Sequence, residues 1–135
     1  MTNKKLKILI ADDDPDYLFQ MQINLQSWGY EVFTTGSQKE AERVISTFKP
    51  DLAIFDLMME QDDSGFILAY RFKQLYPDVP VIISTAVSAE TGINFGYNQQ
   101  EDRNWIKADL YLEKGLQPER LKQEIENLLK KNGTA

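Results

Sequence analysis

The sequence predicts a single doubly wound α/β domain in which five parallel strands alternate with helices, a (βα)5 layout. Five short apolar runs begin roughly 20 to 30 residues apart, and amphipathic helical patterns lie between them. Strands that are apolar on both faces are typical of a parallel sheet covered by helices on both sides through right-handed crossovers. The chain has 135 residues, which suffices for one core, and we expect that core over residues 5–131.

The first predicted strand, residues 6–11, is followed directly by signals for a helix. Asp14 precedes Pro15, which is the pattern of an N-cap and a proline at the first helical position. Gly29 indicates the end of this helix. Its apolar stripe consists of Leu18, Met21, Leu25 and Trp28.

A second strand is predicted at residues 30–34, with a second helix after it. Ser37 and Glu40 have the spacing of a capping box, and Lys49 followed by Pro50 is expected to close this helix. The apolar stripe of the helix consists of Ala41, Val44, Ile45 and Phe48.

The second half of the chain continues the alternation, with strands predicted at residues 52–55, 79–84 and 110–112. A helix with a less regular apolar face is expected at residues 66–75, and a last helix is expected to end near Lys131. The stripe of the last helix consists of Leu121, Ile125, Leu128 and Leu129.

Residues 87–107 form the least regular segment of the sequence. Two glycines and three asparagines weaken a helix here, whereas the aromatic side chains of Phe95, Tyr97 and Trp105 indicate that parts of the segment pack against the core. We expect a loop with a short helix.

Composition excludes several classes of chemistry. The chain has no cysteine and no histidine, so disulfides, thiolate or imidazole metal sites, histidine-based catalytic triads and an internal phosphohistidine are ruled out. Its apolar runs are too short for a signal peptide or a membrane span. The net charge of −6 argues against a nucleic-acid surface. We therefore expect a cytoplasmic protein that contacts neither nucleic acid nor membrane directly.

Acidic side chains follow two strands that should be neighbours. In a flavodoxin-like sheet of order 2-1-3-4-5, ligands bind where the carboxyl ends of the first and third strands meet. Asp12 and Asp13 follow the first predicted strand, and Asp56 follows the third. Two unit charges ~4 Å apart interact by about 4 kcal/mol at an effective dielectric near 20, so one carboxylate would take up a proton unless a cation were present. Mg²⁺, which prefers oxygen ligands, resolves this conflict.

The other strand ends supply complementary groups. The fourth strand ends near the Thr85 hydroxyl and the fifth near the Lys114 ammonium. Carboxylates, a metal ion, a hydroxyl and a lysine suit phosphoryl transfer, with Asp56 as the nucleophile. Plainer interpretations stay open for the isolated residues: the first acids as a helix-start cluster, Thr85 as a strand end and Lys114 as a solvated turn charge.

Four segments carry a family resemblance: "ILIADDDPDYL", "PDLAIFDLMM", "PVIISTA" and "LYLEKG". In this order, at the ends of the predicted strands, they resemble the conserved segments of response-regulator receiver domains, the CheY-like family of two-component signalling. The resemblance spans nearly the whole chain. It implies a phosphoacceptor at Asp56, a Mg²⁺ site of Asp12, Asp13, Asp56 and the main-chain carbonyl of Met58, phosphoryl-binding groups at Thr85 and Lys114, and a switch residue at Tyr111.

The sequence also departs from the family pattern. Glu60 stands where a proline is common, and "EQDDSG" has one residue more than usual before its glycine. Gly115 replaces the proline that usually follows the lysine, which is expected to leave Lys114 less fixed. The chain between Thr85 and Lys114 is longer than usual, so the fourth helix of the family is expected to be remodelled. Tyr111 is compatible with a packed aromatic residue as well as with a switch.

The leading hypothesis is a stand-alone receiver that takes a phosphoryl group from a sensor histidine kinase and acts on an unidentified downstream protein, as a monomer or weak dimer. We expect no attached output domain. One alternative is a pseudo-receiver that binds partners without phosphorylation. A Mg²⁺-dependent aspartyl phosphohydrolase is weaker, because Met58 stands where a second acid is usual. A dinucleotide-binding site is weaker still, because no glycine lies between Ala11 and Trp28.

Overall fold

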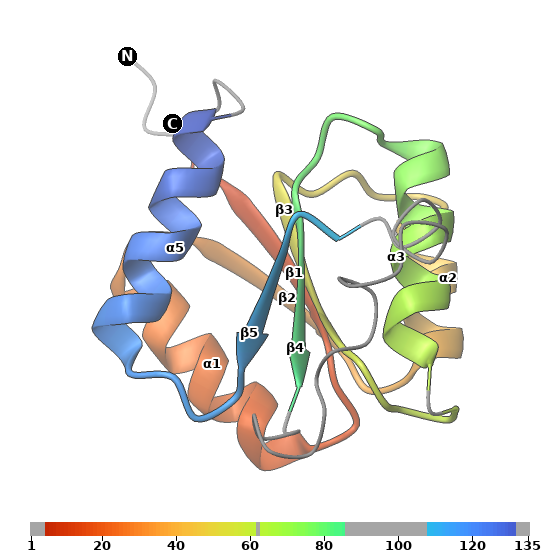
Figure 1. Cartoon of the computed structure of the whole chain (residues 1–135), viewed down its shortest axis with the longest axis horizontal. Helices are drawn as coiled ribbons and strands as arrows, with labels where there is room; N and C mark the ends of the chain where they lie inside the picture. Colours follow the sequence, from red (N-terminus) through yellow and green to blue (C-terminus); the bar gives the residue numbers. More distant parts are fainter. Residues whose placement is uncertain (1–4, 62, 86–107, 132–135) are drawn as a thin grey trace, which may run out of the picture.

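The computed structural model describes residues 5–61, 63–85 and 108–131 (Figure 1). The strands in these parts of the chain form one parallel sheet in the order β2-β1-β3-β4-β5, as predicted. The elements are β1 (Lys7–Ala11), α1 (Pro15–Ser27), β2 (Glu31–Thr35), α2 (Gln38–Ile45), β3 (Leu52–Asp56), α3 (Ser64–Leu75), β4 (Val81–Thr85), β5 (Leu110–Glu113) and α5 (Pro118–Lys131).

Helices cover both faces of the sheet. Figure 1 shows α1 and α5 on one face and α2 and α3 on the other. Alternate residues of β1 serve the two sides: Ile8 and Ile10 pack with α1 and α5, whereas Leu9 and Ala11 pack with α2 and α3. Because both sets are fully buried, the central strands need apolar residues at every position, which explains the continuous runs in the sequence.

The boundaries of α1 are those that the sequence predicts. The Asp14 side chain accepts hydrogen bonds from the main-chain N–H groups of Asp16 and Tyr17, and Pro15 opens the helix. After the helix, Gly29 has φ +97°, a conformation that favours glycine because it has no Cβ. Asp14 is therefore used as a helix cap.

The second helix is shorter than predicted. It ends at Ile45, where the hydroxyls of Ser46 and Thr47 donate to the carbonyls of Arg43 and Val44 and close the last turn. Phe48 consequently lies outside the helix, yet it still packs on the sheet, with its ring 4.5 Å from that of Phe33. The predicted stripe identified core residues correctly, but Lys49 and Pro50 do not mark the end of the helix.

Only one of the two hydrogen bonds of the predicted capping box of α2 is present. Ser37 accepts a hydrogen bond from the N–H of Glu40, but the Glu40 carboxylate binds the N–H of Gly36, one residue before the N-cap.

The first and last residues of the strands also differ from the predicted ones by one or two positions. Most relevant to the site, Asp56 is the last residue of β3, in register with Ser84 of β4, and does not follow the strand.

Two expectations lie outside the described residues: the short helix and packed aromatic residues predicted within 87–107, and the remodelled fourth helix. Within the parts of the chain that the structure describes, no helix combines the length and apolar character that a membrane crossing requires.

Gly65, in the first turn of α3, allows this helix to approach the end of β3. A Cβ at this position would lie 2.6 Å from the carbonyl oxygen of Asp56 and 2.7 Å from the Cα of Leu57, both main-chain atoms. The Gly65 N–H donates to the Leu57 carbonyl at 2.8 Å, so the contact also orients the chain after Asp56.

We expect Gly65→Ala to lower the free energy of unfolding by about 1–3 kcal/mol, because the backbone must shift to admit the methyl group. Urea unfolding followed by circular dichroism measures the change. Gly115→Ala is the matched control, since a Cβ there meets nothing within 4 Å. An equal effect of both substitutions would contradict this account of Gly65.

Candidate functional site

Three aspartates converge at the carboxyl ends of β1 and β3. Asp12 and Asp13 follow β1, Asp56 ends β3, and the two strands are hydrogen-bonded neighbours. One carboxylate oxygen from each of the three lies within 4.8 Å of the others. Asp12 and Asp56 are buried and Asp13 is exposed. The sequence-based prediction that these acids lie together is consistent with this geometry.

Asp12 is oriented by the main chain. Its Oδ1 accepts a hydrogen bond from the N–H of Asp14 at 2.9 Å, while its own N–H donates to the Thr35 carbonyl at 3.1 Å. The turn between β1 and α1 thus directs Asp12 towards the site, whereas Asp14 turns back to cap the helix. Of the three consecutive acids, Asp12 and Asp13 therefore belong to the cluster, whereas Asp14 caps the helix.

Lys114 places a cation between the two buried acids. Its Nζ lies 2.8 Å from Asp12 Oδ2 and 3.3 Å from Asp56 Oδ1. The Lys114 N–H donates to the Thr85 carbonyl at 2.9 Å, which anchors the residue just beyond β5. The lysine thus has partners for both its main chain and its side chain, and the expectation that Gly115 leaves Lys114 less fixed than a proline would stays a prediction.

The site shifts the protonation of its charged groups. Burial, followed by the charge of Asp12, raises the pKa of Asp56 from 3.8 to about 6, although Lys114 opposes the change. Burial would lower the pKa of Lys114, but its hydrogen bond and attraction to Asp12, with the added charge of Asp56, outweigh burial and raise that pKa. The carboxylates therefore repel one another in the absence of a further cation, and Lys114 stays protonated.

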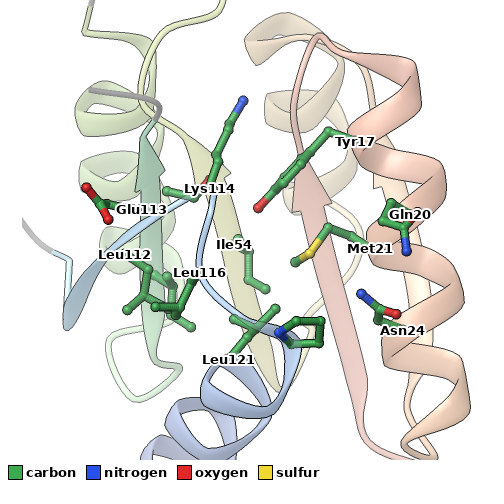
Figure 2. A pocket seen from close by; sticks show the side chains of 13 residues that line it. Tyr17, Gln20, Met21, Asn24, Ile54, Leu112, Glu113, Lys114, Leu116 and Leu121 are labelled. Atoms are coloured by element: carbon green, nitrogen blue, oxygen red, sulfur yellow. The ribbon is translucent and has the colours of Figure 1, made fainter. Parts of the chain in front are cut away.

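Tyr17 is a neighbour of this cluster that the sequence analysis did not identify. The Lys114 Nζ lies 4.7 Å from the centre of the Tyr17 ring. Figure 2 shows Tyr17 reaching from α1 towards Lys114. Both residues line a cavity of about 180 Å³. Burial raises the pKa of the Tyr17 hydroxyl. The sequence offers only a weak signal, namely an aromatic residue in the first turn after the acidic cluster.

The remaining predicted residues lie around this centre. Thr85 is buried at the end of β4. Tyr111, on β5, is 38% exposed and packs edge-on against Phe66 of α3, with ring centroids 6.3 Å apart. Met58 is two residues beyond Asp56 and its side chain is exposed. Its thioether sulfur is a soft donor, so only its main-chain carbonyl suits a hard cation.

The donor set fits a hard divalent cation. Three carboxylates at the ends of two neighbouring strands supply oxygen ligands, and one of them, Asp13, is open to solvent. Mg²⁺ commonly takes a few carboxylate oxygens and retains waters, so a partly open acidic pocket suits it. A buried carboxylate beside a lysine and a cation site can act as a nucleophile towards a phosphoryl group.

Glu60 connects this region to the second helix, a role that the sequence analysis did not anticipate. Its Oε1 accepts from the Gln38 N–H at 2.7 Å, and its Oε2 accepts from the Lys39 N–H at 3.0 Å. Desolvation raises the pKa of Glu60, but the backbone hydrogen bonds from Lys39 and Gln38 outweigh it and lower the pKa. The loop after β3 is thereby tied to the N-terminus of α2.

We expect Glu60→Ala to lower the free energy of unfolding by about 1 kcal/mol, as for the loss of a helix cap, and Glu60→Gln to lower it less, because one acceptor oxygen remains. Because the folded pKa is depressed, this stabilisation is present at neutral pH and is lost as the pH falls through the folded pKa. Urea titrations at pH 7 and pH 3 measure both effects. Equal stability of wild type and Glu60→Ala at pH 7 would refute the tether.

Comparisons with known proteins agree with this geometry. A family model for the response regulator receiver domain matches residues 8–126. Transcriptional regulatory protein GlrR of Escherichia coli (strain K12) is 41% identical over 86 residues, which cover 64% of this chain and 19% of that protein. The alkaline phosphatase synthesis transcriptional regulatory protein PhoP of Bacillus subtilis (strain 168) is 28% identical over 129 residues, covering 96% of this chain and 50% of that protein. The chain thus spans half or less of these relatives.

Solved structures match the same fold over most of the chain. A CheY-like receiver domain protein of Methanospirillum hungatei JF-1 has a TM-score of 0.80 at 24% identity, covering 96% of this chain and 98% of that one. A crystal structure of a "putative response regulator" from Chloroflexus aurantiacus J-10-fl has a TM-score of 0.79 at 29% identity, covering 94% of this chain and 99% of that one. With the family match over 8–126, these findings show that the chain belongs to the response regulator receiver domain family of two-component systems.

Proposed function

We propose that Asp56 accepts a phosphoryl group from the phosphohistidine of a sensor histidine kinase in a Mg²⁺-dependent reaction. The observation that supports this proposal most directly is the convergence of buried Asp56 with Asp12, Asp13 and the Lys114 ammonium. Proteins of this family generally combine an acidic Mg²⁺ pocket with such a lysine.

In the proposed reaction, an oxygen of the Asp56 carboxylate attacks the phosphorus atom. The bond between phosphorus and the histidine nitrogen breaks, its electron pair returns to the imidazole, and an acyl phosphate forms on Asp56. With a pKa of about 6, the carboxylate is largely ionised near neutral pH and can act as the nucleophile. Its burial limits access of water to the product.

Asp12, Asp13 and Asp56 would hold the metal ion, with the main-chain carbonyl of Met58 as a further ligand. When bound, Mg²⁺ neutralises the clustered carboxylates and the charge on the phosphoryl oxygens. Lys114 is already protonated between Asp12 and Asp56, so it can shift its ion pair to a phosphoryl oxygen without taking up a proton.

We further propose that the phosphoryl group draws the Thr85 hydroxyl towards it and that Tyr111 changes its position in response. Tyr111 suits this role because it is on the neighbouring strand, partly exposed, and in contact with Phe66 of α3. A change at this ring would alter the surface that a downstream protein meets, as a shift between two pre-existing states.

Incubation with acetyl phosphate and Mg²⁺, followed by intact-mass measurement, tests the proposal. We expect the mass of one phosphoryl group to be added to wild type and to be lost on treatment with hydroxylamine. No adduct should form on Asp56→Asn or in excess EDTA. Failure of the wild type to form an adduct would favour a phosphorylation-independent binding module, and rapid turnover of unrelated phosphate esters would favour a hydrolase.

A further inference from the structure

The lysine of the site lies in a segment with little intrinsic rigidity. Gly115 follows Lys114, and a Cβ at Gly115 would meet nothing within 4 Å, so packing does not constrain the turn at this residue. Two main-chain hydrogen bonds flank it: Lys114 N–H to the Thr85 carbonyl at 2.9 Å, and Leu116 N–H to the Glu113 carbonyl at 3.2 Å. These bonds place the Lys114 backbone but leave its long side chain to be positioned by its surroundings.

Tyr17 supplies a surface for that side chain. An ammonium has three N–H groups, and Asp12 and Asp56 provide partners at 2.8 Å and 3.3 Å. The Tyr17 ring lies against the same ammonium, 4.7 Å from ring centre to Nζ, and the lysine side chain is only 20% exposed. A cation beside an aromatic face is attracted by the electron density of the ring, more strongly when water is excluded.

Tyr17 is itself well placed by the fold. It lies in the first turn of α1, where its N–H donates to the Asp14 cap at 3.4 Å, and its side chain packs on the core cluster between the sheet and α1 and α5. In Figure 2 the ring projects from α1 towards the segment that carries Lys114. The helix start therefore places the main chain of Tyr17, and the core cluster packs against its side chain.

We propose that Tyr17 is a positioning residue for Lys114: its ring holds the ammonium between Asp12 and Asp56 and supplies the restraint that the glycine at 115 does not. The placement of the ammonium follows from the contact between Lys114 and the Tyr17 ring. The effect on the rate of adduct formation at Asp56 rests on the phosphoryl transfer proposed above. The aromatic face, not the hydroxyl, is the group that matters.

A spectroscopic measurement tests the placement without any phosphorylation. In the NMR spectrum of the full chain, the Lys114 Hε resonance, identified by its absence in Lys114→Arg, is expected upfield of the other lysines because of the Tyr17 ring. Tyr17→Phe should keep this shift and Tyr17→Leu should abolish it. Phe19→Leu, which removes a 66% exposed ring from the same helix, should leave it unchanged.

A kinetic measurement tests the consequence. With phosphoramidate and Mg²⁺ as phosphodonor system, we expect Tyr17→Leu to form the Asp56 adduct about fivefold more slowly than wild type, and Tyr17→Phe to stay within about twofold, given the usual strength of a partly buried cation–aromatic contact. Circular dichroism confirms that each variant is folded, and Tyr17→Trp provides a second variant that retains an aromatic face.

The outcomes separate the two proposals. Loss of the Hε shift and a slower Tyr17→Leu, with Phe and Trp close to wild type, support the positioning role. An Hε shift that survives in Tyr17→Leu, or equal rates for Tyr17→Leu and Tyr17→Phe, overturns it. If wild type forms no adduct, the proposed function fails, and the NMR comparison alone decides whether Tyr17 holds the lysine.

Discussion

Asp56→Asn is expected to be more stable than wild type by about 2–3 kcal/mol at pH 7.5 in the absence of divalent cations. The reason is that burial and the charge of Asp12 raise the pKa of Asp56 to about 6, so the ionised carboxylate is unfavourable in the folded protein. Asparagine has nearly the same shape without the charge. Lys114 lies 2.8 Å from Asp12 in wild type and is expected to keep this ion pair in the variant.

The pH dependence has a definite sign. Because the pKa of Asp56 is higher in the folded chain, about 6 against 3.8, the folded state binds more protons between these values. The free energy of unfolding of wild type therefore falls as the pH rises from about 4 to about 6, and this contribution is then constant. The advantage of Asp56→Asn should accordingly appear at pH 7.5 and shrink towards pH 4.

Urea unfolding in EDTA at several pH values measures this difference. Asp14→Asn is the matched control: it removes the same charge two residues from Asp12, and asparagine is an equally good N-cap. The control should not reproduce the pH-dependent gain. Equal stability of wild type and Asp56→Asn at pH 7.5 would mean that the folded site does not penalise the charge of Asp56.

Asp13→Asn is expected to weaken Mg²⁺ binding on the order of 100-fold, because it removes one of three charges that face the cation. Asp13 is the exposed member of the cluster, so this substitution disturbs the core less than a change at Asp12. Asp14→Asn removes a charge from the next residue, whose side chain caps α1, and should stay within about threefold of wild type.

Isothermal titration calorimetry with MgCl₂ at fixed ionic strength gives both affinities. At a concentration about 100 times its Kd, Mg²⁺ should also offset the stability difference described above, because a ligand that binds only the folded state stabilises it by mass action, here by about 2.7 kcal/mol for wild type, while Asp56→Asn changes little. Similar affinities for Asp13→Asn and Asp14→Asn would contradict a site built on Asp12, Asp13 and Asp56 and would point to nonspecific attraction by the acidic surface.

Several features of the fold were predictable because their causes are local. Pro15 and Asp14 determine how α1 begins, and Gly29 how it ends, through backbone preferences that depend on adjacent residues. The end of α2 was mispredicted because the hydroxyls of Ser46 and Thr47 close the helix while Phe48 still reaches the core from the turn. A periodic pattern of apolar residues indicates which side chains pack on the core, and Phe48 still packs there after the helix has ended.

The sequence by itself determined the alternation of strands and helices, the sheet order expected of that alternation, and the presence of acids at two adjacent strand ends. Only the tertiary structure decided that Lys114 would lie between Asp12 and Asp56, that Tyr17 would support it, and that Glu60 would bind the start of α2. The physical reason is the separation along the chain over which each effect acts. Propensities, caps and periodicity act over a few residues, whereas these contacts join residues far apart in the chain and depend on the directions of side chains after the sheet has formed.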